Sequence, residues 1–222
     1  MLDTVKNARV NGLDLVALGE VVEGIEKDAG KAIVGFDVTT RWTGQTRSET
    51  IVDGFTMAGE RVERSHKIIA DEPCELLGAD SAPNPQELLM AAFNACIMVG
   101  YVAGASLKGI NLESVEIKTR GELDLRGFLG LNDAVAPGYE AIDYQVRIKG
   151  DGSREDFVDI HQTVMKTSPN YFNISRPIRV NGSLQLGCTA RIAQEFVARG
   201  TAEGLDTRCV ARYTPPPFVV VR

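Results

Sequence analysis

The stretch that decides the fold reads NPQELLMAAFNAC and occupies residues 84–96. It opens with a complete helix start signal, because Asn84 can cap, Pro85 suits the first helical position, and Glu87 stands where a capping box has its partner. The predicted helix runs over residues 86–108 and is apolar on almost every side. A helix without a polar face must be enclosed on all sides. The stretch therefore predicts a long helix in the middle of the core.

Before this helix, the spacing of the apolar residues changes from that of a helix to that of a strand. Over residues 14–27 the apolar residues fall on one helical face, which predicts a helix. Over residues 34–42 apolar side chains alternate with polar ones, as in a strand with one buried face. A turn leads to a second strand at 48–52, and residues 65–70 have the pattern of a third. We expect the first two strands to form a hairpin.

The chain after the central helix continues with strands and shorter helices. Two strands are expected over residues 112–125 and 139–149, and the second alternates strictly between apolar and polar side chains. Ser153 can cap a helix that reaches residue 166, and Ser168 followed by Pro169 repeats that start signal for a short helix. A last strand is expected over 178–186. This order predicts an α+β fold in which an antiparallel sheet wraps a long buried central helix.

The sequence divides into one main domain and two arms. We expect an N-terminal helical arm over residues 1–32, the main domain over 33–186, and a C-terminal arm over 187–222 that docks on a partner chain. A chain of 222 residues fits one large domain with arms better than two full domains.

Charge and composition exclude several classes of partner. The net charge of -6 argues against binding to nucleic acid, because an acidic surface repels phosphates. The longest apolar stretch, residues 88–107, is interrupted by polar residues and glycines, so we expect a buried helix and no membrane span. The first residues lack the pattern of a secretory signal, which favours a cytoplasmic, reducing location.

Cysteine and histidine usage argues against metal and disulfide frameworks. The four cysteines are widely spaced and form no CxxC pair, which argues against a zinc site or a dense set of disulfides; they are Cys74, Cys96, Cys188 and Cys209. The two histidines, His66 and His161, have no partners at metal-ligand spacing. We expect neither a metal nor a cofactor.

Residues 84–96 resemble the NPEELLAAALAAC helix of the OsmC/Ohr family. The resemblance extends over residues 33–183 and implies an intertwined homodimer, with two central helices between wrapping sheets and active sites at the dimer interface. It also implies reduction of organic hydroperoxides by a reactive cysteine. In such enzymes a second cysteine resolves the oxidised thiol, and an arginine and a glutamate activate the first.

Carried over to this sequence, the resemblance makes Cys96 the reactive cysteine and Arg47 the activating arginine. Both also have a simpler interpretation, Cys96 as a small buried hydrophobe and Arg47 as a solvated turn charge, with Arg41 a weaker choice for the arginine. Two positions depart from the family pattern. Gln86 replaces the activating glutamate, and an uncharged amide cannot form the pair with arginine.

The second departure is Ser168, which stands in place of the resolving cysteine and cannot form a disulfide. A helix cap explains this serine fully, and Glu87, next to Gln86, is better explained as the capping-box partner of Asn84.

Two functions remain open from the sequence. The first is a thiol-dependent redox protein that reduces organic hydroperoxides, a small-molecule substrate, through Cys96 and an external thiol reductant. The second is a catalytically silent dimer that binds a small apolar ligand. Its cleft would be lined by Phe93, Cys96, Met98, Tyr171 and Phe172.

Overall fold

The structure is a computed structural model that describes residues 9–184 and 187–212. The chain divides into two units, residues 1–177 and 178–222. The first unit holds every helix and strand that positions Cys96, and the second begins after the last helix of the first.

The first unit begins with a small hairpin and a helix. These elements are β1 (Arg9–Val10), β2 (Leu13–Asp14), α1 (Leu15–Lys27) and the short 3-10 helix η1 (Ala29–Ala32). Asp14 caps α1 by accepting hydrogen bonds from two backbone N–H groups of its first turn. Asn11 donates through its amide to Ser106 and to the carbonyl of Ile110, so the hairpin is fixed to the end of the central helix.

A four-stranded antiparallel sheet follows. Its strands are β3 (Val34–Phe36), β4 (Thr39–Gly44), β5 (Arg47–Met57) and β6 (Glu60–Ala70), and β5 lies between β6 on one edge and β3 and β4 on the other. The predicted hairpin is present, and its second strand is longer than expected. The face predicted to be buried is open within this chain: Trp42 is 76% exposed, and Phe36 is exposed as well. No described residue of the same chain covers these apolar side chains.

A buried carboxylate fixes the loop between this sheet and the central helix. Asp71 accepts hydrogen bonds from the Ser81 hydroxyl at 2.7 Å and the Thr46 hydroxyl at 2.7 Å, and from backbone N–H groups of the loop. The Ser81 hydroxyl, followed by that of Thr46, holds the pKa of Asp71 far below its ordinary value. The backbone N–H of Asp71 also donates to the carbonyl of Pro83, next to the cap of the helix.

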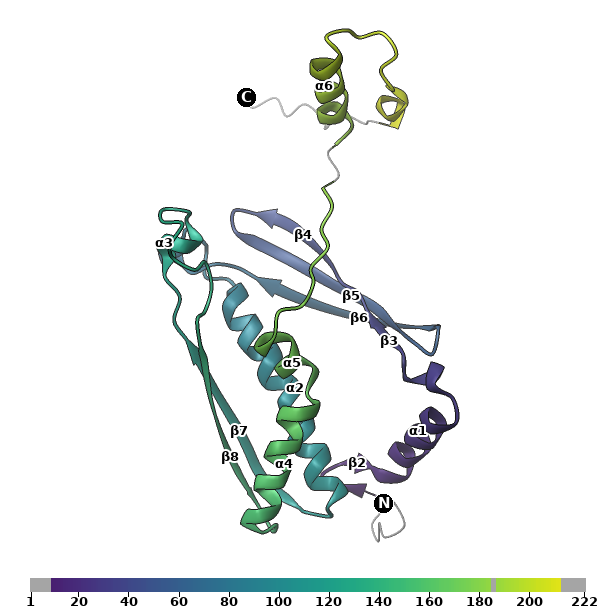
Figure 1. The fold of residues 1–222 in the computed structure, drawn as a ribbon, viewed down its shortest axis with the longest axis vertical. Coiled ribbons are helices and arrows are strands. Elements are labelled where there is room, and N and C mark those ends of the chain that lie inside the picture. The colour runs from purple at the N-terminus through teal and green to yellow at the C-terminus, as the bar shows by residue number, and fades with distance from the viewer. Residues whose placement is uncertain (1–8, 185–186, 213–222) are drawn as a thin grey trace, which may run out of the picture. The chain divides into compact units, whose positions relative to one another are not determined.

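The central helix is α2 (Pro85–Leu107), and the capping box predicted for it is present. The remaining elements of this unit are β7 (Leu112–Gly121), α3 (Leu125–Phe128), β8 (Ile142–Gly150), α4 (Arg154–Thr167) and α5 (Pro169–Ser175). As Figure 1 shows, α2 packs against β7 on one side and against α4 and α5 on another. The strand predicted to reach residue 125 ends at Gly121, because Asp124 caps α3.

The core lies between α2, α4 and the β7–β8 pair. It is formed by Phe93, Ile97, Tyr101, Ala105, Ile110, Ile160 and Val164. Burial alternates along β8 as predicted, with every second side chain from Ile142 to Gly150 turned inward. Sequence periodicity was sufficient here, because one face of the strand lies on the core and the other on solvent.

The prediction that α2 is enclosed on every side is wrong for the single chain. Its buried apolar side chains lie on one face, whereas Val99, away from that face, is 68% exposed, and Leu89 and Leu107 are also exposed. Among the described residues α2 is the one helix long and apolar enough to cross a membrane. The core helix of a soluble protein meets the same criterion, and the buried face of α2 forms such a core.

The second unit contains α6 (Cys188–Arg199) and the 3-10 helix η3 (Arg208–Arg212). The strand predicted over residues 178–186 is wrong where the structure describes it: residues 178–184 are not a strand, and 185–186 lie outside the described residues. No strand of the described chain pairs with this segment, and Val180 is 85% exposed. A strand needs a hydrogen-bonded neighbour, and the periodicity of the sequence does not show whether one is present.

A disulfide joins Cys188 at the start of α6 to Cys209 in η3, with 5.7 Å between the Cα atoms. The wide spacing of the cysteines did not predict this bond, because a disulfide depends on distance in space. Cys74 and Cys96 are free thiols.

Candidate functional site

Cys96 lies in the middle of α2, half-buried, and faces the junction between α4 and α5. Its Sγ atom is 3.4 Å from the Oγ atom of Ser168, a residue 72 positions further along the chain. The structure therefore brings together the two positions that the resemblance assigned to the reactive and the resolving cysteine.

Ser168 is fixed by the two helices that meet at it. Its backbone N–H donates to the carbonyl of Val164 at the end of α4, and its Oγ accepts a hydrogen bond from the backbone N–H of Tyr171 at the start of α5. The residue is only 6% exposed. The predicted cap is present, and it leaves the hydroxyl hydrogen of Ser168 free to point elsewhere.

That hydrogen can point at Cys96. A hydroxyl has one donor and two acceptor sites, and the Tyr171 N–H occupies one acceptor site. A thiolate can only accept, so in the ionised form of Cys96 Ser168 must be the donor. The Ser168 hydroxyl is therefore placed to donate one hydrogen bond to Cys96 Sγ.

Two glycines of α2 allow the close approach that this contact requires. A Cβ atom on Gly100 would lie 2.9 Å from a methyl group of Val164, and one on Gly104 would lie 3.1 Å from a methyl group of Ile160. Both partners belong to α4 and are buried. Larger residues at these glycines would push α4 away from α2 and carry Ser168 away from Cys96.

An aromatic hollow of about 350 Å³ lies one helical turn before Cys96. Its wall contains Phe93, whose ring meets Tyr144 edge to face at 5.4 Å and Tyr171 at 6.4 Å between centroids. Burial, with a smaller contribution from Tyr171, raises the pKa of Tyr144, so its phenol stays neutral. The hollow presents aromatic and aliphatic side chains, neutral hydroxyl groups and one acidic residue, Glu140.

The residues around Cys96 are similar to a known protein family. Residues 78–182 match the family model for OsmC-like proteins. This part of the chain is similar to OsmC-like proteins. The matched residues contain both Cys96 and Ser168, whereas β3 to β6 and the helix α6 lie outside the match.

Solved structures extend the likeness at the level of the fold. An OsmC-like protein from Mycoplasma pneumoniae superposes with a TM-score of 0.50 at 14% identity, covering 63% of this chain and 86% of that one. An OsmC-like protein of unknown function from Vibrio cholerae has a TM-score of 0.48 at 14% identity, covering 61% and 90%. The organic hydroperoxide resistance protein OsmC from Legionella pneumophila has a TM-score of 0.38 at 16% identity, covering 61% and 87%.

The Mycoplasma structure supports the fold alone, and the α+β fold predicted from the sequence is confirmed. The other two are too distant to carry an argument. A comparison with curated proteins finds no significant match.

The other positions that the OsmC-like resemblance singled out lie apart from Cys96 in this chain. Arg47 begins β5, and its guanidinium donates to the Thr43 hydroxyl at 3.1 Å. Arg47 and Cys96, both described, share no hydrogen bond. Glu87 is held by the capping box, where its carboxylate accepts from the backbone N–H of Asn84 at 2.9 Å. Gln86 is half-buried in the first turn of α2, ten residues from Cys96 and roughly 15 Å along the helix.

Of the residues predicted to line a ligand cleft, Phe93 and Tyr171 line the aromatic hollow. Cys96 follows Phe93 by one turn. Met98 does not line the hollow, and Phe172 is half-exposed with the Arg176 guanidinium 5.0 Å above its ring. Sequence reasoning missed Tyr144, although the alternation along β8 placed it on the core side, level with the central helix.

Proposed function

We propose that this chain is a thiol-dependent redox protein that reduces organic hydroperoxides through a single peroxidatic cysteine, Cys96. The observation that carries the proposal is the contact between Cys96 Sγ and Ser168 Oγ, which are 3.4 Å apart. Phe93 and Tyr171, each three residues from one of these two positions, line the aromatic hollow. A hydroperoxide with an apolar substituent suits such surroundings, and the OsmC-like match supports redox chemistry in general.

The reaction needs an outside source of electrons, because Ser168 cannot resolve an oxidised thiol. The Cys96 thiolate attacks the outer oxygen of the peroxide, the O–O bond breaks, and an alcohol leaves after taking up a proton. Cys96 then carries a sulfenic acid. One external thiol condenses with it to a mixed disulfide and water, and a second thiol releases Cys96 as a thiol and leaves with the first as a disulfide.

A homodimer is part of the proposal. The exposed face of α2, with Val99 and Leu89, and the open face of the sheet, with Trp42 and Phe36, are apolar surfaces that a second copy would remove from water. We further propose a cytoplasmic location, where low-molecular-weight thiols serve as the reductant and the Cys188–Cys209 disulfide is also open to reduction.

The alternative, a catalytically silent dimer that binds an apolar ligand, has less support. Three of its five proposed lining residues, Cys96, Met98 and Phe172, lie outside the aromatic hollow. The retained thiol and its hydroxyl partner have no role in that function.

The test is a stoichiometric reaction with cumene hydroperoxide. Peroxide loss is followed together with trapping of sulfenic acid by dimedone and mass spectrometry. Cys96→Ser should abolish both signals, whereas Cys74→Ser, which removes an exposed free thiol, should leave them unchanged. The proposal fails if Cys96→Ser consumes peroxide as fast as wild type, or if neither protein consumes any.

A further inference from the structure

A second hollow, of about 700 Å³, lies between β8 and α4 and takes no part in the proposed reaction. Its floor is apolar and comes from Val146 and Ile148 of β8 and Phe157 of α4. Tyr144 lines both this hollow and the aromatic one near Cys96. The volume is within the usual range for small-molecule sites, roughly 300–1,000 Å³.

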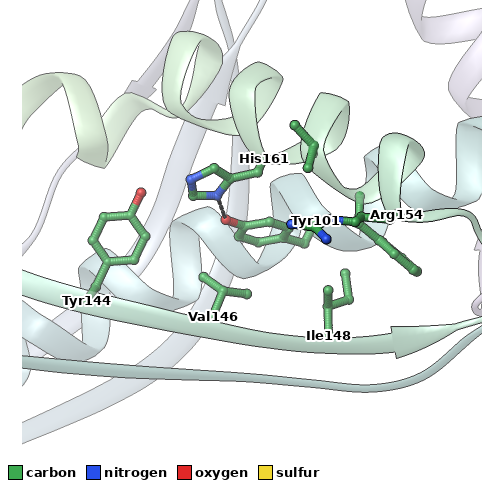
Figure 2. A pocket seen from close by; sticks show the side chains of 8 residues that line it. Tyr101, Tyr144, Val146, Ile148, Arg154 and His161 are labelled. Atoms are coloured by element: carbon green, nitrogen blue, oxygen red, sulfur yellow. Dashed lines mark hydrogen bonds between the residues drawn. The ribbon is translucent and has the colours of Figure 1, made fainter.

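A tyrosine and a histidine form a hydrogen bond at the back of this hollow. The Tyr101 hydroxyl and the Nδ1 atom of His161 are 2.5 Å apart, and Tyr101 is only 2% exposed. Burial raises the pKa of Tyr101, so its phenol keeps the proton. In the tautomer in which this hydroxyl donates the hydrogen bond to Nδ1, the ring N–H is on Nε2. Figure 2 shows this second nitrogen pointing toward Tyr144 and away from Tyr101.

At the other end of the hollow lies Arg154, the first residue of α4 (Figure 2). The nearby carboxylates of Asp156 and Asp159 are held by Lys108, at 3.3 and 2.9 Å. Within the described chain no carboxylate lies within 4.0 Å of the Arg154 guanidinium, and no acidic residue lines the hollow. The hollow thus combines the guanidinium of Arg154, the imidazole of His161 and the apolar side chains of β8 and α4.

We propose that this hollow binds a small aromatic carboxylic acid. Its carboxylate pairs with Arg154, and its ring lies on Val146 and Ile148. An acceptor on the far side of the ring meets the Nε2–H of His161. Each group of the ligand matches one part of the lining. The guanidinium favours a carboxylate, the apolar floor favours a ring, and the N–H donor favours an oxygen acceptor.

The test uses 4-hydroxybenzoate as the probe and the full chain as the protein. Affinity is measured by isothermal titration calorimetry, with saturation-transfer NMR to show that the ring of the probe is in contact with protein. Arg154→Gln should weaken binding by roughly tenfold or more, because it removes a charge-assisted hydrogen bond. Lys166→Gln is the matched control, since it removes an exposed cation from the same helix outside the hollow. Benzamide, which has the ring without the charge, should bind more weakly than the probe.

Three results would overturn the proposal. They are equal affinity of Arg154→Gln and wild type, an equal loss in Lys166→Gln, and no binding by wild type at millimolar probe. Thermal melting of each variant shows that it is folded. Repeating the titration on Cys96→Ser keeps the result independent of the peroxide reaction.

Discussion

Replacing Ser168 with cysteine should convert the site into one that closes an internal disulfide with Cys96. The Oγ and Sγ atoms are 3.4 Å apart, and a disulfide bond is about 2.05 Å long, so the two atoms must approach by roughly 1.4 Å. The longer C–S bond of cysteine supplies part of that distance. One equivalent of peroxide should therefore oxidise the Ser168→Cys variant to a disulfide, whereas wild type stops at the sulfenic acid.

The size of the effect follows from the 72-residue separation of the two positions. Closing a loop of that length lowers the entropy of the unfolded chain by an amount worth about 4 kcal/mol. For a unit of this size, that stabilisation raises the melting temperature by roughly 10 °C. Loss of the serine cap offsets about 1 kcal/mol of it.

The assay compares thermal unfolding of the oxidised Ser168→Cys protein with that of the same variant carrying Cys96→Ser. Both lack the cap and both keep the Cys188–Cys209 disulfide, so the difference isolates the new bond. Peptide mapping identifies the linked cysteines. Equal melting temperatures, or linkage of the new thiol to Cys74 in place of Cys96, would refute the geometry described for this site.

Three further outcomes are expected. Ser168→Ala should slow sulfenic acid formation by roughly tenfold, because the thiolate loses a donor, whereas Ser168→Thr should retain most of the rate; similar rates in both variants would contradict the donor role. Gly100→Ala should lower the free energy of unfolding by about 1–3 kcal/mol in urea melts, because its methyl group meets the buried Val164; an unchanged midpoint would show that α4 shifts freely. Asp71 has a lowered pKa when folded, so its carboxylate stabilises the fold above about pH 4 and loses that effect as the pH falls further. The melting temperature of Asp71→Asn should therefore lie below that of wild type at pH 7, and a gap that does not narrow below pH 4 would contradict this.

The parts of the fold that depend on neighbours in the sequence were predictable. The capping box of α2 needs only Asn84 and Glu87, three residues apart, and the inward side chains of β8 follow from a period of two. The segment 178–184 has an equally strand-like pattern but no partner strand within the described chain. The strand prediction failed because a strand forms only when it is hydrogen-bonded to a second strand.

The candidate site likewise has features that the local sequence predicts and features that it does not. A family motif led to Cys96 and Ser168 separately, but their contact depends on how closely α2 approaches α4. That approach is set by Gly100 and Gly104, which the sequence marked only as small residues. The Cys188–Cys209 bond and the open face of α2 likewise depend on arrangements in space that no local pattern encodes.

The oxygen atom of Ser168 has a consequence for how this site tolerates mutation. One atom both begins α5 and contacts the thiol, so stability and reactivity cannot be adjusted independently at this position. A cysteine at this position could form a disulfide with the oxidised Cys96 but would be a poorer helix cap. An alanine would lose both the cap and the contact with the thiol. Serine at this position stabilises the junction between α4 and α5, and the oxidised cysteine must then be reduced by an external thiol.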